Sequence, residues 1–324
     1  MRELNPRRPA RCGAAASVLL IAACGRSDVL VATGGGGGDA GGDADGLGEY
    51  DGGWPITGDA DTDEDPPECD LDSHSSDCDG DGVPDADDPF PTDTYRPGRA
   101  REDVIYVHSA FTLSSLAPES APIVETIADF SFPDDAFSQV TDIAIDRFGV
   151  LYALGSDVLH ACDPSTAQCW ALASVPSNSL AFLPLGTLDN DDDTLVTLAG
   201  SAWTRIDLRG PEVAVTVIGE IEAPYSSSGD ITTTSDDLTV FSSPSATGVD
   251  LVLALDPATG TVFGVIGLAS GLSNVWGMAS VRGALWLFDQ VGNIATMDSI
   301  SGEVVVVGFG LDGFWGAASH PDLR

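Results

Sequence analysis

The strongest constraint on the fold is a repeat of about 45 residues in the last two thirds of this 324-residue chain. Each repeat contains a short apolar segment of the kind that forms a buried strand, and the five segments start 43 to 47 residues apart. The segments are VIYV at 104–107, LYAL at 151–154, LVTL at 195–198, LTVF at 238–241 and LWLF at 285–288. Helical periodicity is not sustained anywhere in this region, so it is expected to be all-β.

A chain reversal recurs in step with these segments. Aspartate occupies the same turn position in four of the five units, at Asp163, Asp207, Asp256 and Asp298. Aspartate favours a turn because its side chain bonds to the backbone two residues further on. Another apolar segment follows each turn, so one unit has room for four strands, which is the size of one blade of a β-propeller.

A repeated tryptophan-glycine pattern predicts how the ring closes. WGMAS at 276–280 begins the last full unit, and WGAAS at 315–319 repeats it with no further unit behind it. The first unit starts directly at its second strand, so the final strand is expected to complete the first blade and leave no open edge at the seam. We predict a five-bladed propeller over residues 101–324. Six blades are the alternative if residues 178–230 contain a degenerate unit, and a β-sandwich is the alternative fold.

The turn LDPATG at 255–260, together with this spacing, resembles the quinoprotein-like and YVTN-like propeller repeats of bacteria. The resemblance covers most of residues 103–320. It implies a fold and says little about a ligand.

The amino-terminal segment has the features of an export signal. Four arginines within the first eleven residues precede an apolar run over residues 13–23, which is shorter than the about 20 residues that span a bilayer. The run ends in LIAAC at 20–24, which resembles a bacterial lipobox. The resemblance implies a signal peptide over residues 1–23 and lipidation of Cys24. Glycine, not aspartate, follows this cysteine at position 25, which resembles Gram-negative lipoproteins of the outer membrane. A signal peptide without lipidation is the alternative.

Residues 24–68 are rich in glycine and aspartate and include five consecutive glycines at 34–38. Such a composition buries too little apolar surface to offset chain entropy, so we predict a disordered tether. The whole chain has 51 acidic and 13 basic residues and a net charge of −38. This charge argues against nucleic acid as a partner. We expect a monomer held at a membrane by its lipid, with an unknown protein or polysaccharide partner.

Residues 77–88 have the ligand spacing of a calcium loop. Carboxylates fall at relative positions 1, 3, 5, 9 and 12, and Gly82 at position 6 supplies the sharp turn. Without a cation the five carboxylates would repel one another. We therefore predict Ca²⁺ as the cofactor, bound by Asp77, Asp79, Asp81, Asp85, Asp88 and the carbonyl of Val83. An acidic, solvated linker is the alternative.

The stretch DCDGDGVPDADDPFPTD at 77–93 resembles a thrombospondin type 3 repeat of bacterial envelope proteins. The resemblance implies the same six calcium ligands within a small unit at residues 69–95. Phe90 stands where many such repeats have a cysteine, and only one clear repeat is present.

The cysteines are consistent with export. Apart from Cys12 in the signal segment and Cys24, four remain as two close pairs, and an even number in an exported chain indicates disulfides. We predict the bridges Cys69–Cys78 and Cys162–Cys169. A zinc site is disfavoured because neither pair has the CxxC spacing.

No catalytic residue is assigned. The propeller histidines His108, His160 and His320 show no recognisable catalytic spacing. Asp142, Asp146 and Asp230 lie near the strands expected to line the central channel, where an acidic mouth with calcium would be similar to lactonase-like propellers. The preferred function is a non-catalytic binding or scaffold module, and a calcium-dependent hydrolase or lyase outside the cytoplasm is the alternative. We attribute the six tryptophans (54, 170, 203, 276, 286 and 315) to blade packing rather than to a sugar-stacking platform.

Overall fold

The computed structural model describes residues 69–324 except residues 73, 81–83, 87, 89, 94–95, 133–138, 209–212 and 311–312. The chain divides into two compact units, Met1–Asp63 and Glu64–Arg324, and every described residue belongs to the second. The predicted signal peptide, the lipidation site Cys24 and the predicted tether lie outside the described residues. Among the described residues, no helix has the length and apolar character needed to cross a membrane.

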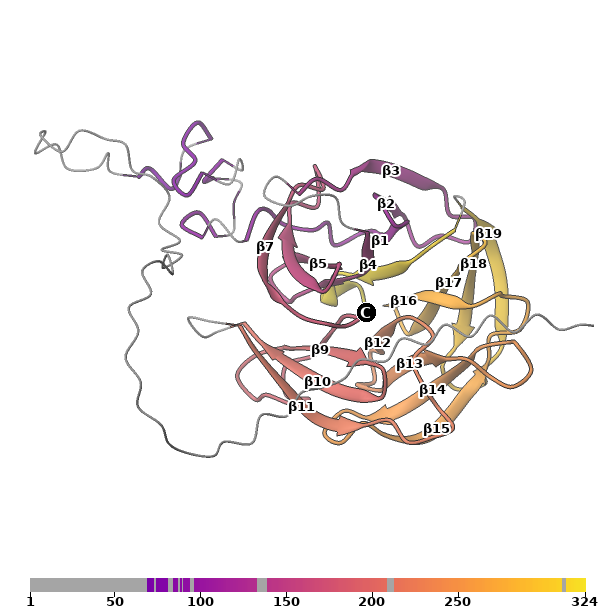
Figure 1. Cartoon of the computed structure of the whole chain (residues 1–324). Coiled ribbons are helices and arrows are strands. Elements are labelled where there is room, and N and C mark those ends of the chain that lie inside the picture. The colour runs from indigo at the N-terminus through magenta and orange to yellow at the C-terminus, as the bar shows by residue number, and fades with distance from the viewer. Residues whose placement is uncertain are drawn as a thin grey trace, which may run out of the picture. The chain divides into compact units, whose positions relative to one another are not determined.

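The second unit contains five antiparallel sheets of four strands each, arranged around a common axis as the blades of a propeller (Figure 1). The prediction of a five-bladed ring is confirmed, and the described residues of 178–230 contribute no sixth blade. Blade 1 is formed by β20(Gly316–Ser319), β1(Ile105–His108), β2(Thr112–Leu116) and β3(Val124–Asp129). Blade 2 follows with β4(Val140–Ile145), β5(Leu151–Gly155), β6(Val158–Cys162) and β7(Cys169–Ser174).

The other three blades keep the same order from the axis outward. Blade 3 is formed by β8(Ala181–Leu183), β9(Thr194–Ala199), β10(Ala202–Asp207) and β11(Ala214–Glu220). Blade 4 is formed by β12(Ile231–Thr233), β13(Thr239–Ser243), β14(Leu251–Asp256) and β15(Thr261–Leu268). Blade 5 is formed by β16(Val275–Val281), β17(Ala284–Asp289), β18(Asn293–Asp298) and β19(Val304–Phe309), and a 3₁₀ turn at Pro321–Leu323 follows the last strand.

The last strand closes the ring as the tryptophan-glycine repeat predicted. β20 pairs antiparallel with β1, from Ile105 opposite Ser319 to His108 opposite Gly316. Blade 1 is thus assembled from both ends of the propeller sequence, and Figure 1 shows the carboxyl-terminal end of the chain at the centre of the ring. Pairing at the seam removes an edge that could otherwise associate with another chain.

The predicted turns are held by their aspartates. Asp163 accepts a hydrogen bond from the Ser165 amide at 2.7 Å, and Asp298 accepts one from the Ser301 amide at 2.6 Å. Asp256 binds the Ala258 amide in the same way at 3.0 Å. These contacts fix the reversal between the third and fourth strand of each of these blades.

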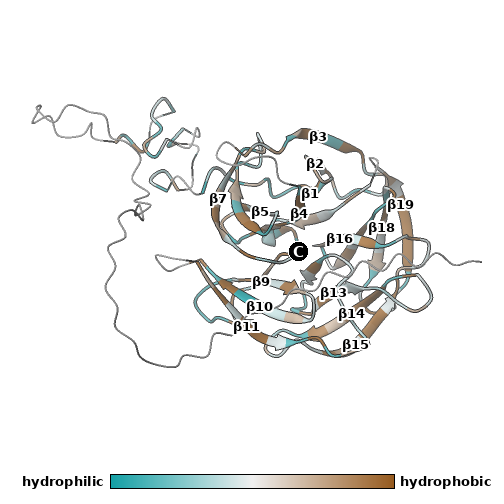
Figure 2. Ribbon diagram, viewed as in Figure 1, coloured by the Kyte–Doolittle hydropathy of each residue, from teal (hydrophilic) through white to brown (hydrophobic). Residues whose placement is uncertain are grey.

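The hydrophobic core lies between neighbouring blades. Figure 2 shows apolar residues along the strands and hydrophilic residues at the turns that connect them. Trp203 is fully buried and donates from Nε1 to the Pro257 carbonyl of the next blade at 2.8 Å. Trp286 is also buried, so blade packing accounts for these two tryptophans. On the outer strands apolar side chains remain exposed, including Phe263 and Phe309.

Candidate functional site

Two buried carboxyl groups lie on the innermost strands at the propeller axis. Asp142 belongs to β4 in blade 2, and Asp230 immediately precedes β12 in blade 4. They are 1% and 0% exposed, and their side chains are hydrogen-bonded to each other. Two carboxylates so close cannot both ionise without strong repulsion, so the pair shares a proton.

These two side chains bind backbone amides from every blade of the ring. Asp142 accepts one hydrogen bond from its own blade and one from blade 3, while Asp230 accepts from its own blade and from blades 5 and 1. The five donors are the amides of Ile143 (2.9 Å), Leu180 (2.6 Å), Ile231 (2.6 Å), Met278 (2.6 Å) and Ala317 (3.2 Å). The carboxyl pair therefore joins all five innermost strands.

Burial is the main cause that raises the pKa of both groups well above their usual range. The negative charge of Asp230 and a hydrogen bond donated to it raise the pKa of Asp142 further. For Asp230, the donated hydrogen bonds from Met278, Ile231, Ala317 and Asp142 oppose the effect of burial. Asp142 is accordingly the protonated member and Asp230 the carboxylate that its neighbours solvate.

A glycine gives this pair its space. A Cβ placed on Gly316 would lie 2.4 Å from Asp142 Oδ1 and 2.4 Å from His108 Nε2. His108 is 1% exposed, its Nδ1 lies 2.8 Å from the Ser109 carbonyl oxygen, and its Nε2 is buried with no hydrogen-bond partner. Burial lowers the pKa of His108 to about 4. The imidazole is therefore neutral at physiological pH.

Directly beside the carboxyl pair, a hollow of ≈ 320 Å³ opens at the end of the axis where the innermost strands begin. We call it the axial mouth. Each blade contributes one residue from the start of its innermost strand or from just before it, and blade 4 contributes a second. The lining residues are Thr141, Asn178, Ser228, Gly229, Trp276 and Trp315, of which none is charged.

Two walls of the axial mouth differ in chemistry. Trp276 and Trp315, from blades 5 and 1, lie edge to face with ring centroids 5.7 Å apart and an interplanar angle of 72°. Both rings are half-buried, so part of each faces solvent. On the polar side, the hydroxyl of Ser228 is buried and has no hydrogen-bond partner. Trp276 and Trp315 thus pack on each other across two blades and also line the mouth.

At the opposite end of the axis an arginine occupies the channel. Arg324 donates to the Phe182 carbonyl at 3.1 Å and lines a narrow hollow with the innermost strands. Burial lowers the pKa of its guanidinium. The hollow at this end measures ≈ 20 Å³, against ≈ 320 Å³ for the axial mouth on the tryptophan side.

Asp146, the third acid expected near the channel, does not lie with Asp142 and Asp230. It follows β4, and its Oδ1 accepts hydrogen bonds from the amides of Phe148 at 2.9 Å and Val150 at 2.8 Å. Burial raises its pKa. Asp146 thus holds a turn at the far end of β4.

The predicted calcium loop is described in part. Asp81, Gly82 and Val83 lie outside the described residues. Asp85 is 3% exposed and accepts hydrogen bonds from the Ser76 hydroxyl at 2.5 Å and the Cys78 amide at 2.9 Å. The side chain of Asp77 accepts the Gly80 amide at 2.8 Å.

Asp88, at the end of this loop, is buried and has one carboxylate oxygen without a hydrogen-bond partner. It is 7% exposed, its Oδ1 accepts the Phe90 amide at 2.7 Å, and its Oδ2 is buried with no hydrogen-bond partner. Burial raises the pKa of Asp88, and the charges of Asp79, Asp85 and Asp77 raise it further. The carboxylates at positions 1, 3, 9 and 12 are thus close enough to repel one another.

The predicted calcium loop contacts the propeller through Phe90. Its ring packs edge to face on Phe148 with centroids 5.7 Å apart, and the guanidinium of Arg96 lies 4.9 Å from the Phe90 ring centroid. Phe90 therefore docks this loop on the apolar cluster shared by blades 2 and 3.

Both predicted disulfides are present. Cys69 is bonded to Cys78 at the entry of the calcium loop, and Cys162 is bonded to Cys169 between β6 and β7. Disulfides are typical of proteins outside the reducing cytoplasm. They close short loops of nine and seven residues in sequence separation, and each removes conformational freedom from the unfolded chain.

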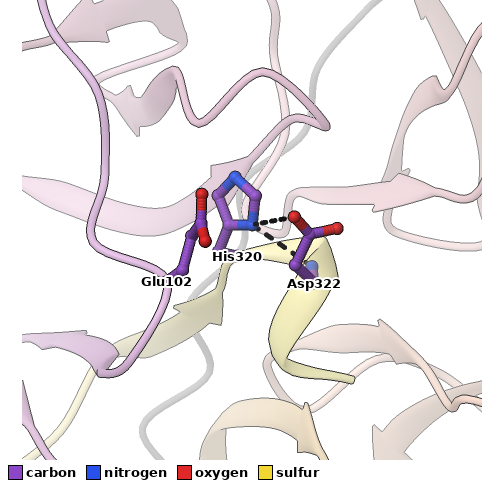
Figure 3. A group of neighbouring side chains, drawn as sticks. All are labelled: Glu102, His320 and Asp322. Carbon is purple, nitrogen blue, oxygen red and sulfur yellow. Dashed lines mark hydrogen bonds and ion pairs between the residues drawn. The ribbon is translucent and has the colours of Figure 1, made fainter.

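A third group of ligand-type side chains, Glu102, His320 and Asp322, lies beside the 3₁₀ turn (Figure 3). His320 Nδ1 accepts the Asp322 amide at 3.2 Å, and Glu102 pairs with Arg99 at 2.5 Å. Burial lowers the pKa of His320. His320 Nδ1 and Glu102 thus have partners within the chain and hold the turn, while His320 Nε2 is buried with no hydrogen-bond partner.

The sequence pointed to only part of this site. Asp142 and Asp230 were expected near the channel, but their mutual bond was not. The axial mouth was missed, although a signal existed: the residue pairs Thr141-Asp142, Asn178-Ser179, Gly229-Asp230, Trp276-Gly277 and Trp315-Gly316 occupy equivalent positions at the start of the five innermost strands.

No protein-family model matches this sequence, and no curated protein matches it. Among solved structures, BamB from Moraxella catarrhalis is 19% identical over 64% of this chain and 62% of that chain, with a TM-score of 0.30. A protein of unknown function from Bacteroides thetaiotaomicron is 14% identical over 66% of this chain and 62% of that one, with a TM-score of 0.43. A symmetrical protein from work on de novo evolutionary emergence is 14% identical over 67% and 98%, with a TM-score of 0.44. The fold assignment rests on this chain's own sheet topology.

Proposed function

We propose that this protein is a lipid-anchored, calcium-binding module of the cell envelope whose propeller binds a partner without catalysing a reaction. The observation that supports this most is the axial mouth: an open hollow with uncharged walls lies over a carboxyl pair that backbone amides occupy. A propeller of this kind offers recognition at its axis and a rigid frame around it.

The alternative of a calcium-dependent propeller hydrolase or lyase is less well supported. Such an enzyme needs an accessible base, nucleophile or metal ligand at the axis. Asp142 and Asp230 are 1% and 0% exposed, and amide N–H groups point at their oxygens. A cation at this place would meet hydrogen-bond donors, and the uncharged walls of the mouth offer no general base.

Calcium binding at residues 77–88 is supported by the state of the described carboxylates. A divalent cation would satisfy the buried, unpartnered Oδ2 of Asp88 and offset the repulsion among Asp77, Asp79 and Asp88. Asp85 stands at position 9, where such loops often bind through a water molecule. Its bonds to Ser76 and Cys78 fit that indirect role. Asp81 and the Val83 carbonyl would complete the ligand set.

Attachment to the outer membrane is proposed from the sequence, because Cys24 follows a lipobox-like run and precedes Gly25. Two disulfides agree with a location outside the cytoplasm. Several acyl chains on one cysteine would bind stably, since each buried CH₂ contributes about 0.8 kcal/mol.

Calcium titration of the intact protein by isothermal calorimetry tests the metal site. We expect one binding event, and we expect Asp88→Asn to weaken it by at least about tenfold because one charged ligand of a hard cation is lost. The exposed Asp72 of the same segment provides the matched control, and Asp72→Asn should bind as the wild type does. Absence of heat at millimolar calcium, or equal weakening in both variants, would remove the site.

A further inference from the structure

We propose that the axial mouth binds the ring of a neutral saccharide. This inference rests on the proposed binding function and names the class of its ligand. It is drawn from three properties of the mouth: an aromatic wall, an unpaired hydroxyl in its lining, and uncharged lining residues within a strongly acidic protein.

The aromatic wall is formed by Trp276 and Trp315. Their edge-to-face arrangement, with centroids 5.7 Å apart, leaves ring surface at the mouth, where both side chains are half-buried. The face of an indole carries partial negative charge. The C–H bonds on one side of a pyranose ring carry partial positive charge, so that side of a sugar packs favourably on an indole.

The position of Trp276 is fixed by close backbone packing. A Cβ on Gly229 would lie 2.6 Å from the Trp276 Cα, and a Cβ on Gly277 would lie 2.9 Å from the Gly316 carbonyl carbon. Only glycine lets the innermost strands of blades 4, 5 and 1 approach this closely. The tryptophans are thereby held on a rigid frame at the rim of the axis.

The polar wall offers hydrogen bonds of both kinds. The Ser228 side chain lines the mouth, and its buried hydroxyl has no hydrogen-bond partner within the chain, which costs stability while it stays unpaired. Thr141 donates from Oγ1 to the Leu154 carbonyl at 3.1 Å and keeps lone pairs that accept. Asn178 is exposed at the rim and has both a donor and an acceptor. Sugar hydroxyls are likewise donors and acceptors.

Charge and size narrow the ligand class. Among the residues that the structure describes, no charged side chain lines the mouth, while the chain has a net charge of −38. Anionic ligands are therefore repelled at long range and find no counter-charge among these residues. A purely apolar ligand would leave the Ser228 hydroxyl unpaired. The volume of ≈ 320 Å³ is at the lower end of the about 300–1,000 Å³ typical of ligand pockets, which suits one sugar ring or the terminal residue of a glycan.

The test measures tryptophan fluorescence and calorimetric heat while the intact protein is titrated with glucose, galactose, mannose or N-acetylglucosamine. Glucuronate serves as the anionic probe and decanoate as the apolar one. We expect saturable binding of at least one neutral sugar, with a change in emission. Saturable binding of glucuronate or decanoate in place of every neutral sugar would overturn the proposal, and so would the absence of binding by all four sugars.

Variants assign the binding to the axial mouth. Trp276→Ala should lower the affinity for the sugar at least about tenfold, because a central aromatic contact is lost. Trp170, half-buried on the outer strand β7, is the matched control, and Trp170→Ala should leave affinity unchanged. Equal loss in both variants would overturn the assignment to the mouth.

Ser228→Ala separates a binding role from a structural one. Because its hydroxyl is unpaired in the free protein, its removal should leave the urea midpoint equal or higher while sugar affinity falls about threefold. A lower midpoint with unchanged affinity would contradict a binding role. Calcium titration of the same variants should match the wild type, so failure of the saccharide proposal remains distinct from failure of the calcium-binding proposal.

Discussion

Asp142 donates a hydrogen bond to Asp230 at the axis of the propeller, and the two carboxyl groups together accept backbone amides from all five blades. A ring of five sheets is thus held at its centre by one proton and two side chains that lie 88 residues apart in sequence. Each partner affects the other: the four donors that face Asp230 favour its charged form, and the charge of Asp230 favours the protonated form of Asp142.

The two halves of this pair are predicted to respond unequally to substitution. Asp230→Asn places an amide N–H₂ against amide donors and should lower the free energy of unfolding by about 3 kcal/mol. Asp142→Asn keeps a donor toward Asp230 and loses one acceptor, so the cost should be about 1 kcal/mol. Urea unfolding followed by tryptophan emission measures both. A larger loss for Asp142→Asn would reverse the assignment of the proton.

Gly316 is predicted to tolerate no side chain. A methyl group there would lie 2.4 Å from both Asp142 Oδ1 and His108 Nε2, so Gly316→Ala should cost about 2–4 kcal/mol through forced displacement of buried groups. Gly264→Ala is the control, since its Cβ would meet only the Ala254 methyl at an ordinary 3.7 Å. Thermal unfolding of the two variants should separate them clearly. Similar melting temperatures would contradict the described crowding at the axis.

His108 should make the protein less stable in acid. Its pKa is lowered to about 4 in the folded state against 6.5 for the free side chain, so its contribution is fully present above pH 6.5 and is lost as pH falls toward 4. The full contribution is about 3 kcal/mol. His108→Gln should therefore flatten the loss of stability between these two pH values.

The carboxyl pair acts in the opposite direction, because groups with raised pKa favour the folded state more at low pH than at high pH. The measurement is consequently a comparison of unfolding free energies for wild type and His108→Gln at several pH values, in which the Asp142–Asp230 contribution is common to both. Identical pH profiles would show that the imidazole is not buried in its neutral form.

Cys24 is predicted to hold the protein at the membrane. Cys24→Ala should abolish incorporation of labelled fatty acid and move the protein from the detergent phase to the aqueous phase. Cys12→Ala is the matched control and should remain in the detergent phase. Retention of Cys24→Ala in membranes would mean that another feature of the chain provides the attachment.

The sequence was informative about the fold because the constraint there is local and repeated. Strand segments 43 to 47 residues apart and the two tryptophan-glycine patterns were sufficient for five blades and for the pairing of the last strand with the first. The turn aspartates and both disulfides also follow from short-range patterns. Trp203 and Trp286 pack between blades as expected.

The site was less predictable because it exists only after the ring has closed. Nothing near Asp142 in the sequence indicates that Asp230 will neutralise it, since their contact needs two blades brought to one axis. In the sequence, Trp276 and Trp315 look like ordinary packing residues of a strand. They line the mouth because they lie at or just before the start of an innermost strand. The burial of the Ser228 hydroxyl without a partner likewise depends on the folded ring and not on a local sequence pattern.

The most direct test of sugar and calcium binding is a crystal structure of the intact protein. The crystals should be grown in calcium and soaked with the neutral sugar that binds best. We expect the sugar ring against Trp276 and Trp315 with one hydroxyl bonded to Ser228 Oγ, and an ion among the carboxylates of residues 77–88. A sugar bound elsewhere over an empty mouth, or a loop whose carboxylates point apart with no ion at millimolar calcium, would contradict it.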